Sequence, residues 1–112
     1  MGLFGRLRSQ TAAKSERRQE LDDVRRHLED FVRTRVGVEA FVEPRTTVTP
    51  PTVLLVASNG EWTRRRVEDP KIVQGLAEQL RVPVYDVRLV GYPKRMRDWN
   101  ERNRPPRTAQ GG

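Results

Sequence analysis

Two stretches of the sequence combine tryptophan with arginine, which is a pairing suited to binding anionic partners. The first is Trp62-Thr63-Arg64-Arg65-Arg66, which we predict to form a β-strand. Side chains alternate across a strand, so Trp62, Arg64 and Arg66 would share one face. An indole can stack on a base while a guanidinium pairs with phosphate, as in proteins that bind single strands. The same arginines could instead cover apolar neighbours, or protect the edge of a sheet.

The second stretch begins at Pro93 and continues past Trp99 into a basic tail. A short helix here would place Tyr92, Met96 and Trp99 on one side, with basic residues between them. This pattern favours contact with RNA, DNA or an acidic protein. In the alternative, the three apolar residues dock the helix on the core and the arginines only keep it soluble. The candidate surface for an anionic partner therefore consists of Trp62, Arg64, Arg66, Lys94, Arg95, Arg97 and Trp99.

Groups that could support catalysis are sparse. The chain has no cysteine and one histidine, His27, which excludes disulfides, thiolate chemistry and multi-histidine metal sites. No glycine-rich phosphate loop, HExxH motif or nucleophile elbow occurs. The acidic residues stand singly or beside basic ones. We therefore predict no catalytic residue, no metal site and no cofactor, and a small enzyme is a less favoured alternative.

The sequence ends in Gln110-Gly111-Gly112. A free diglycine carboxylate is the group that is activated in ubiquitin-like sulfur carriers, and a hairpin, helix and strand in succession resemble part of the β-grasp fold. The long N-terminal helix and the tail after the last strand are foreign to that fold. A carrier is therefore a minor alternative.

Positive charge is concentrated at the two ends of the 112-residue chain, which carries a net charge of +7. Residues 1–36 contain nine basic and six acidic residues, residues 37–92 seven of each, and residues 93–112 six basic and two acidic. The electropositive C-terminal end could steer an anionic partner. No apolar run approaches the roughly 18 residues of a membrane span, so we expect a cytoplasmic protein.

An amphipathic helix is predicted from an N-cap at Ser15 to a C-cap at Gly37. Its apolar residues recur at spacings of three and four: Leu21, Val24, Leu28, Phe31, Val32 and Val36. His27 flanks this stripe and is predicted to be a boundary residue rather than a ligand.

Strands are predicted at residues 38–43, 53–57 and 62–66. Asn59-Gly60 is typical of a two-residue type I′ turn, which would place Ala57 opposite Trp62 and Val53 opposite Arg66. A helix with Asp69 as its N-cap would end near Arg81, and a strand would follow at residues 84–90. Strand, helix and strand in this order indicate a parallel crossover.

These elements predict an α+β fold with the order α-β-β-β-α-β, a mixed sheet of about four strands, two main helices and a short C-terminal helix. We expect a flexible basic N-terminus at residues 1–14, a single domain at 15–99 and a disordered basic tail at 100–112.

Three segments carry a resemblance to known proteins: Val38 to Thr49, Asn59 to Arg66, and Val84 to Asp98. Together they resemble a family of short actinobacterial proteins that has no established activity. The resemblance covers roughly residues 16–100 and implies a bacterial, cytoplasmic setting, but it transfers no site residues.

The function that these observations favour is a non-catalytic binding or accessory protein. Its partner would be anionic, with nucleic acid as the lead candidate and an acidic protein as the next. A protein–protein adaptor that binds through an apolar groove around Tyr92 and Met96 is the alternative. Salt would weaken the first mode of binding steeply and the second only slightly.

Overall fold

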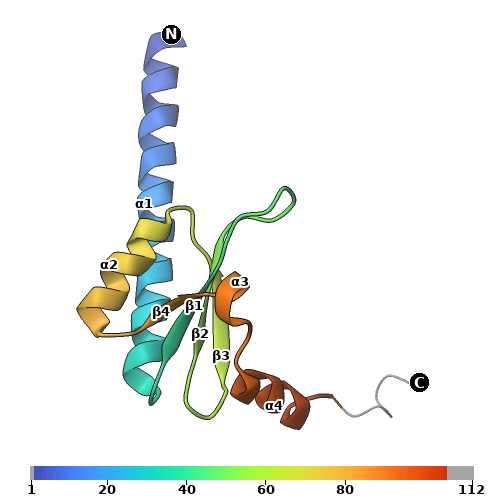
Figure 1. Ribbon diagram of the computed structural model, residues 1–112. Helices are drawn as coiled ribbons and strands as arrows, with labels where there is room; N and C mark the ends of the chain where they lie inside the picture. Colours follow the sequence, from blue (N-terminus) through green and yellow to red (C-terminus); the bar gives the residue numbers. More distant parts are fainter. Residues whose placement is uncertain (1, 106–112) are drawn as a thin grey trace.

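A computed structural model describes the backbone of residues 2–105 and the side chains of residues 12–69 and 71–105. Its elements confirm the predicted α+β class (Figure 1). In chain order they are α1 (Gly2–Thr34), β1 (Glu39–Glu43), β2 (Thr52–Val56), β3 (Trp62–Arg66), α2 (Pro70–Leu80), β4 (Val84–Asp86), α3 (Val87–Val90) and α4 (Lys94–Arg102).

The four strands form one mixed sheet in the order β3-β2-β1-β4. β1 pairs antiparallel with β2, and β2 pairs antiparallel with β3, while β1 and β4 are parallel. β3 and β4 therefore run in the same direction, as the predicted crossover requires, but they lie at opposite edges of the sheet. The connection through α2 passes over both intervening strands.

The β2–β3 hairpin differs from the prediction by one residue in register. Trp62 lies opposite Val56 rather than Ala57, and Arg65 rather than Arg66 lies opposite Val53. The Ala57 amide donates to the Glu61 carbonyl at 2.8 Å, which closes a three-residue loop. Gly60 alone in this loop has a positive φ, of 91°. A type I′ turn needs a positive φ at both central residues, so the predicted turn type was wrong.

Three further boundaries also differ from the prediction. α1 begins at Gly2, so Ser15 lies inside the helix and is not its N-cap. The last strand ends at Asp86 instead of residue 90, because the Asp86 carboxylate accepts the Arg88 amide at 2.8 Å and starts α3. α4 continues through Arg102, into the predicted tail, and residues 106–112 lie outside the described part of the chain.

The 33 residues of α1 make the molecule elongated. At 1.5 Å per residue the helix spans about 50 Å, and the longest extent of the chain is 59 Å. Its N-terminal half projects beyond the sheet (Figure 1), and the side chains of residues 12–23 are exposed. The flexibility predicted for residues 1–14 stays a prediction. None of the described helices has both the length and the apolar character needed to cross a membrane.

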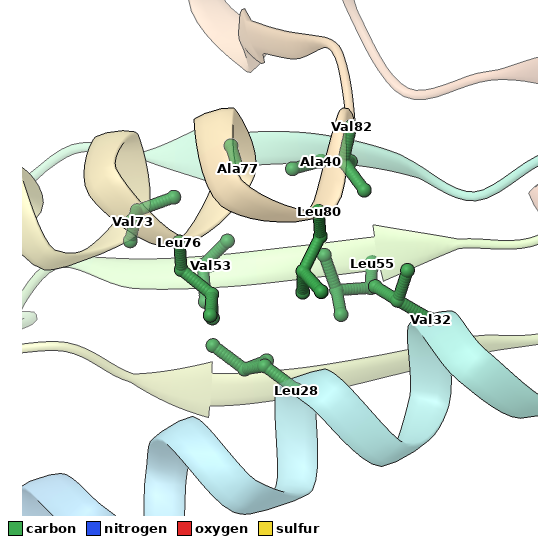
Figure 2. A pocket seen from close by; sticks show the side chains of 10 residues that line it. All are labelled: Leu28, Val32, Ala40, Val53, Leu55, Val73, Leu76, Ala77, Leu80 and Val82. Carbon is green, nitrogen blue, oxygen red and sulfur yellow. The ribbon is translucent and has the colours of Figure 1, made fainter.

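The main core lies between the sheet and the C-terminal half of α1 together with α2. Leu28 and Phe31 from α1 pack with Val53 and Leu55 of β2 and with Leu76 of α2. Side chains from all three elements surround a cavity of about 20 Å³ (Figure 2). Every residue that lines this cavity is apolar, so it is a small packing void and offers no polar group to a ligand.

Candidate anionic-partner interface

The sheet has a second face, opposite α1 and α2, which we call the open face. Strand alternation and the observed register assign to it Glu39, Phe41, Glu43, Thr52, Leu54, Val56, Trp62, Arg64, Arg66 and Tyr85. α4 packs on this face by burying Met96 against Phe41, Leu54 and Val56. The prediction that Trp62, Arg64 and Arg66 share a face is therefore confirmed.

Trp62 is held in place from two sides. Its indole Nε1 donates to Oδ1 of Asn100 in α4 at 2.6 Å. The Arg64 guanidinium lies over the ring, 5.2 Å from its centroid. The indole also packs against the small core beneath α4. Trp62 therefore joins α4 to the sheet, which leaves little of its ring for stacking on a ligand.

Glu43 is the centre of a polar cluster on the open face. Arg64 donates to both of its carboxylate oxygens, at 2.6 and 3.0 Å, and the Thr52 hydroxyl donates at 2.7 Å. The Tyr92 hydroxyl donates a further hydrogen bond. Partial burial raises the pKa of Glu43, but the hydrogen bonds from Arg64, Tyr92 and Thr52 outweigh it and hold the pKa below its ordinary value. The hydrogen bond to Glu43 raises the pKa of Tyr92.

Arg95 has a structural role similar to that of Arg64. Its Nη2 contacts the Glu39 carboxylate at 2.5 Å, and its Nε donates to the Ala57 carbonyl at 3.0 Å. Only 29% of the Arg95 side chain is exposed. These contacts tie α4 to both β1 and the hairpin loop, so Arg95 is not free to meet a partner.

The remaining basic residues of the predicted surface are more accessible. Lys94 pairs with Asp98 at 3.1 Å, but this is an i,i+4 pair in solvent, where such pairs contribute little. Arg66 and Arg97 are exposed, and neither forms an ion pair with another described residue. Arg66, Lys94 and Arg97 are therefore the members of the predicted set whose charge is available to a ligand.

Trp99 lies where α4 meets the hairpin loop and is half-buried. The Arg102 guanidinium lies 5.9 Å from the centroid of its ring and also donates to the Asn59 carbonyl at 2.9 Å. A Cβ at Gly60 would lie 2.9 Å from the Trp99 Cβ and 2.0 Å from the Arg95 carbonyl oxygen. Only glycine at position 60 lets the loop approach α4 this closely.

All seven predicted residues thus belong to the open face or to the helix that packs on it, but only some are available. Their role in binding stays a prediction. The sequence reasoning missed the carboxylates Glu39 and Glu43 as the partners that occupy Arg95 and Arg64. The signal was present, because Glu39, Phe41 and Glu43 alternate along one strand.

On the opposite face, His27 is a boundary residue, as predicted. Its Nε2 lies 2.7 Å from the Thr63 hydroxyl, and Arg65 Nη2 lies 3.3 Å from its Nδ1. Burial and the positive charge of Arg65 lower the pKa of His27. Across the residues that the structure describes, no three His, Cys, Asp or Glu side chains are grouped so that they could hold a metal ion.

A groove of about 590 Å³ runs between α1 and the end of β3. Its floor includes Val24 and Ile72, and charged residues of both signs surround it, among them Arg65, Arg66 and Glu20. The carboxylates that line it are exposed to solvent, so none is desolvated as a catalytic acid or base usually is. The groove therefore has the character of a surface feature.

Comparisons with protein-family models, curated protein sequences and solved structures find no significant match to this chain.

Proposed function

We propose that this protein is a non-catalytic binding or accessory protein whose open face and α4 contact an anionic partner, with nucleic acid as the lead candidate. The observation that carries the proposal is that the predicted aromatic and basic residues gather on one side of the sheet. They come from two segments about thirty residues apart, β3 and α4. Such a gathering of arginine and aromatic side chains suits phosphate contact combined with stacking.

The charge arrangement on this side supports the proposal. The two carboxylates of β1, Glu39 and Glu43, are neutralised by Arg95 and Arg64. They therefore oppose an approaching polyanion much less than free carboxylates would. Arg66, at the end of β3, and Arg97, in α4, keep their charge exposed to solvent. Residues 93–112 contribute six basic residues against two acidic ones, which gives this end a net attraction for polyanions.

The test is the salt dependence of binding to a fluorescently labelled oligonucleotide. The logarithm of the affinity should fall linearly with the logarithm of the salt concentration, with a slope of about −0.7 per phosphate contacted on a single strand. The double variant Arg66→Glu/Arg97→Glu should bind at least about tenfold more weakly and show a shallower slope. The matched control is Arg18→Glu/Arg25→Glu on the exposed side of α1, which makes the same change in net charge.

Equal losses in both double variants would mean that only net charge attracts the ligand, and the assigned surface would be wrong. No binding by the wild-type chain at low salt would refute the proposal as a whole. We also propose a cytoplasmic location, which the resemblance to short actinobacterial proteins favours.

A protein–protein adaptor is the second candidate, because α3 presents apolar side chains to solvent. Leu89 is 85% exposed and Val90 is 54% exposed. Apolar side chains grouped on a surface often mark protein contacts. In this case Leu89→Ser would abolish capture of the partner while the salt dependence stayed small. Gly111 and Gly112, on which the carrier alternative depends, lie outside the described residues.

A further inference from the structure

Two tyrosines on the open face differ from every other aromatic side chain that the structure describes. Tyr85 is 37% exposed and Tyr92 is 44% exposed, whereas Trp62 and Trp99 are half-buried and Phe31 and Phe41 are buried. Stacking on a ligand requires an accessible ring face. The tyrosines therefore meet this requirement better than the tryptophans that the sequence pattern singled out.

Both tyrosines lie along β1, so their rings are held in the neighbourhood of one strand. Tyr85 is opposite Phe41 in the parallel β1–β4 register, and the two ring centroids are 5.5 Å apart. The Tyr92 hydroxyl is held by Glu43, two residues further along the same face of β1. Side chains that are already ordered lose less conformational entropy when a ligand stacks on them.

Cationic residues are present on the open face and in the segment that follows Tyr92. Lys94 and Arg97 follow Tyr92 closely in the chain. Arg64, on β3, forms an ion pair with Glu43, the residue that accepts the hydrogen bond from Tyr92. Arg66 has an open-face position at the end of β3, and it also lines the groove beside α1. The face thus combines accessible rings beside β1 and β4 with guanidinium groups on β3, a combination found on single-strand binding surfaces.

We propose that Tyr85 and Tyr92 form the base-stacking platform of this face, and that the ligand is a single-stranded polynucleotide. The inference rests on the proposed function and specifies its ligand. A duplex hides the faces of its bases inside the helical stack, so only unpaired bases can lie on the two phenol rings. The tryptophans are then structural residues that fix α4, and the tyrosines provide the contact with bases.

The experiment compares three labelled ligands of equal length with the full wild-type chain by fluorescence anisotropy. They are a twelve-nucleotide oligothymidine, an abasic strand with the same phosphates, and the duplex of the oligothymidine with its complement. The proposal predicts that the oligothymidine binds at least about tenfold more tightly than the abasic strand, because stacking on each ring contributes about that factor. It also predicts weaker binding of the duplex, despite its higher charge density.

The variants assign the effect to the rings. Tyr85→Leu/Tyr92→Leu should lose most of the preference for oligothymidine over the abasic strand, while Tyr85→Phe/Tyr92→Phe should keep it because the rings remain. Circular dichroism would check that both variants are folded. If the leucine double variant does not fold, the single variants Tyr85→Leu and Tyr92→Leu make the same assignment, and each should lose part of the preference.

The outcomes separate the two proposals. Equal affinity of the wild-type chain for all three ligands, with a normal salt dependence, would overturn the stacking platform and leave the anion-binding function standing. A preference that persists in the leucine variant would also overturn it. Absence of binding to any of the three ligands would overturn both.

Discussion

Replacing Gly60 with alanine should separate α4 from the hairpin loop. The backbone at Gly60 has a φ of 91°, which is unfavourable for a residue with a Cβ. An added Cβ would also lie 2.0 Å from the carbonyl oxygen and 2.7 Å from the carbonyl carbon of Arg95. These are backbone atoms of a helix, so relief requires that α4 as a whole moves away from the loop.

The size of the effect follows from what α4 contributes. A positive φ costs a residue with a side chain about 1–2 kcal/mol. Displacement of α4 exposes Met96, whose full burial stabilises by about 1.5–3 kcal/mol. It also breaks the 2.6 Å hydrogen bond between Trp62 and Asn100. We therefore expect Gly60→Ala to lower the free energy of unfolding by about 3–5 kcal/mol, a large part of the 5–15 kcal/mol typical of a domain.

Urea unfolding followed by tryptophan fluorescence would measure this loss, and hydrogen exchange would report on residues 94–102. The amides of α4 should exchange faster in the variant than in the wild type. The amides of β2 should keep the same ranking of exchange rates in both proteins. The matched control is Gly75→Ala in α2, where an added Cβ has no neighbour within 4 Å. This change should stabilise the helix by up to about 1 kcal/mol. An unchanged urea midpoint and unchanged exchange in Gly60→Ala would refute the packing argument.

Three further predictions concern stability. Because the pKa of Glu43 is lowered on folding, the stabilisation it contributes is complete above the ordinary value of 4.5 and is lost as the pH falls through the lower, folded value. Melts from pH 7 to pH 3 should therefore show a larger loss of stability in the wild type than in Glu43→Gln, in which Glu61 and Asp86, whose pKa values are also lowered, still titrate. The pKa of His27 is likewise lowered from 6.5, so protonation destabilises the fold as the pH drops below that value, and an NMR titration of the imidazole should give a midpoint below 6.5. Truncation of Leu28, which is 1% exposed, to alanine should lower the free energy of unfolding by about 2–5 kcal/mol. Leu89→Ala should change this free energy by no more than about 0.5 kcal/mol, as measured by urea unfolding.

The elements that the sequence predicted well are those with a strong periodic pattern. The apolar stripe containing Leu28 and Phe31 does pack on the sheet, and the continuous run at β2 is buried between two layers. Asp69 caps α2 by accepting the Lys71 amide at 3.0 Å, as the Asp-Pro pair indicated. In the first two cases the residues that form the sequence pattern also form the packing, and in the third the predicted capping residue itself accepts the hydrogen bond.

The errors occurred where the determining contact was tertiary or where two local signals competed. Asn59-Gly60 satisfies the sequence preference for a type I′ turn, but the loop closes with three residues and packs its glycine against α4. The start of α1 carries no signal, because Ala12, Ala13 and Lys14 favour a helix as much as the residues after Ser15 do. The end of β4 depends on Asp86 acting as a cap, and nothing in the alternating pattern of residues 84–90 marks that choice.

The candidate site shows the same limit more clearly, because the six arginines in β3 and α4 look alike in the sequence. A partly buried carboxylate needs a cationic partner, so Glu43 and Glu39 each recruit the arginine whose side chain reaches them. Arg64 and Arg95 are thereby committed to holding α4 and β3 in place, whereas Arg66 and Arg97 are left in solvent. The number of arginines therefore overstates the binding surface. The positions of the two glutamates on β1 decide which arginines build the face and which remain available to bind a partner.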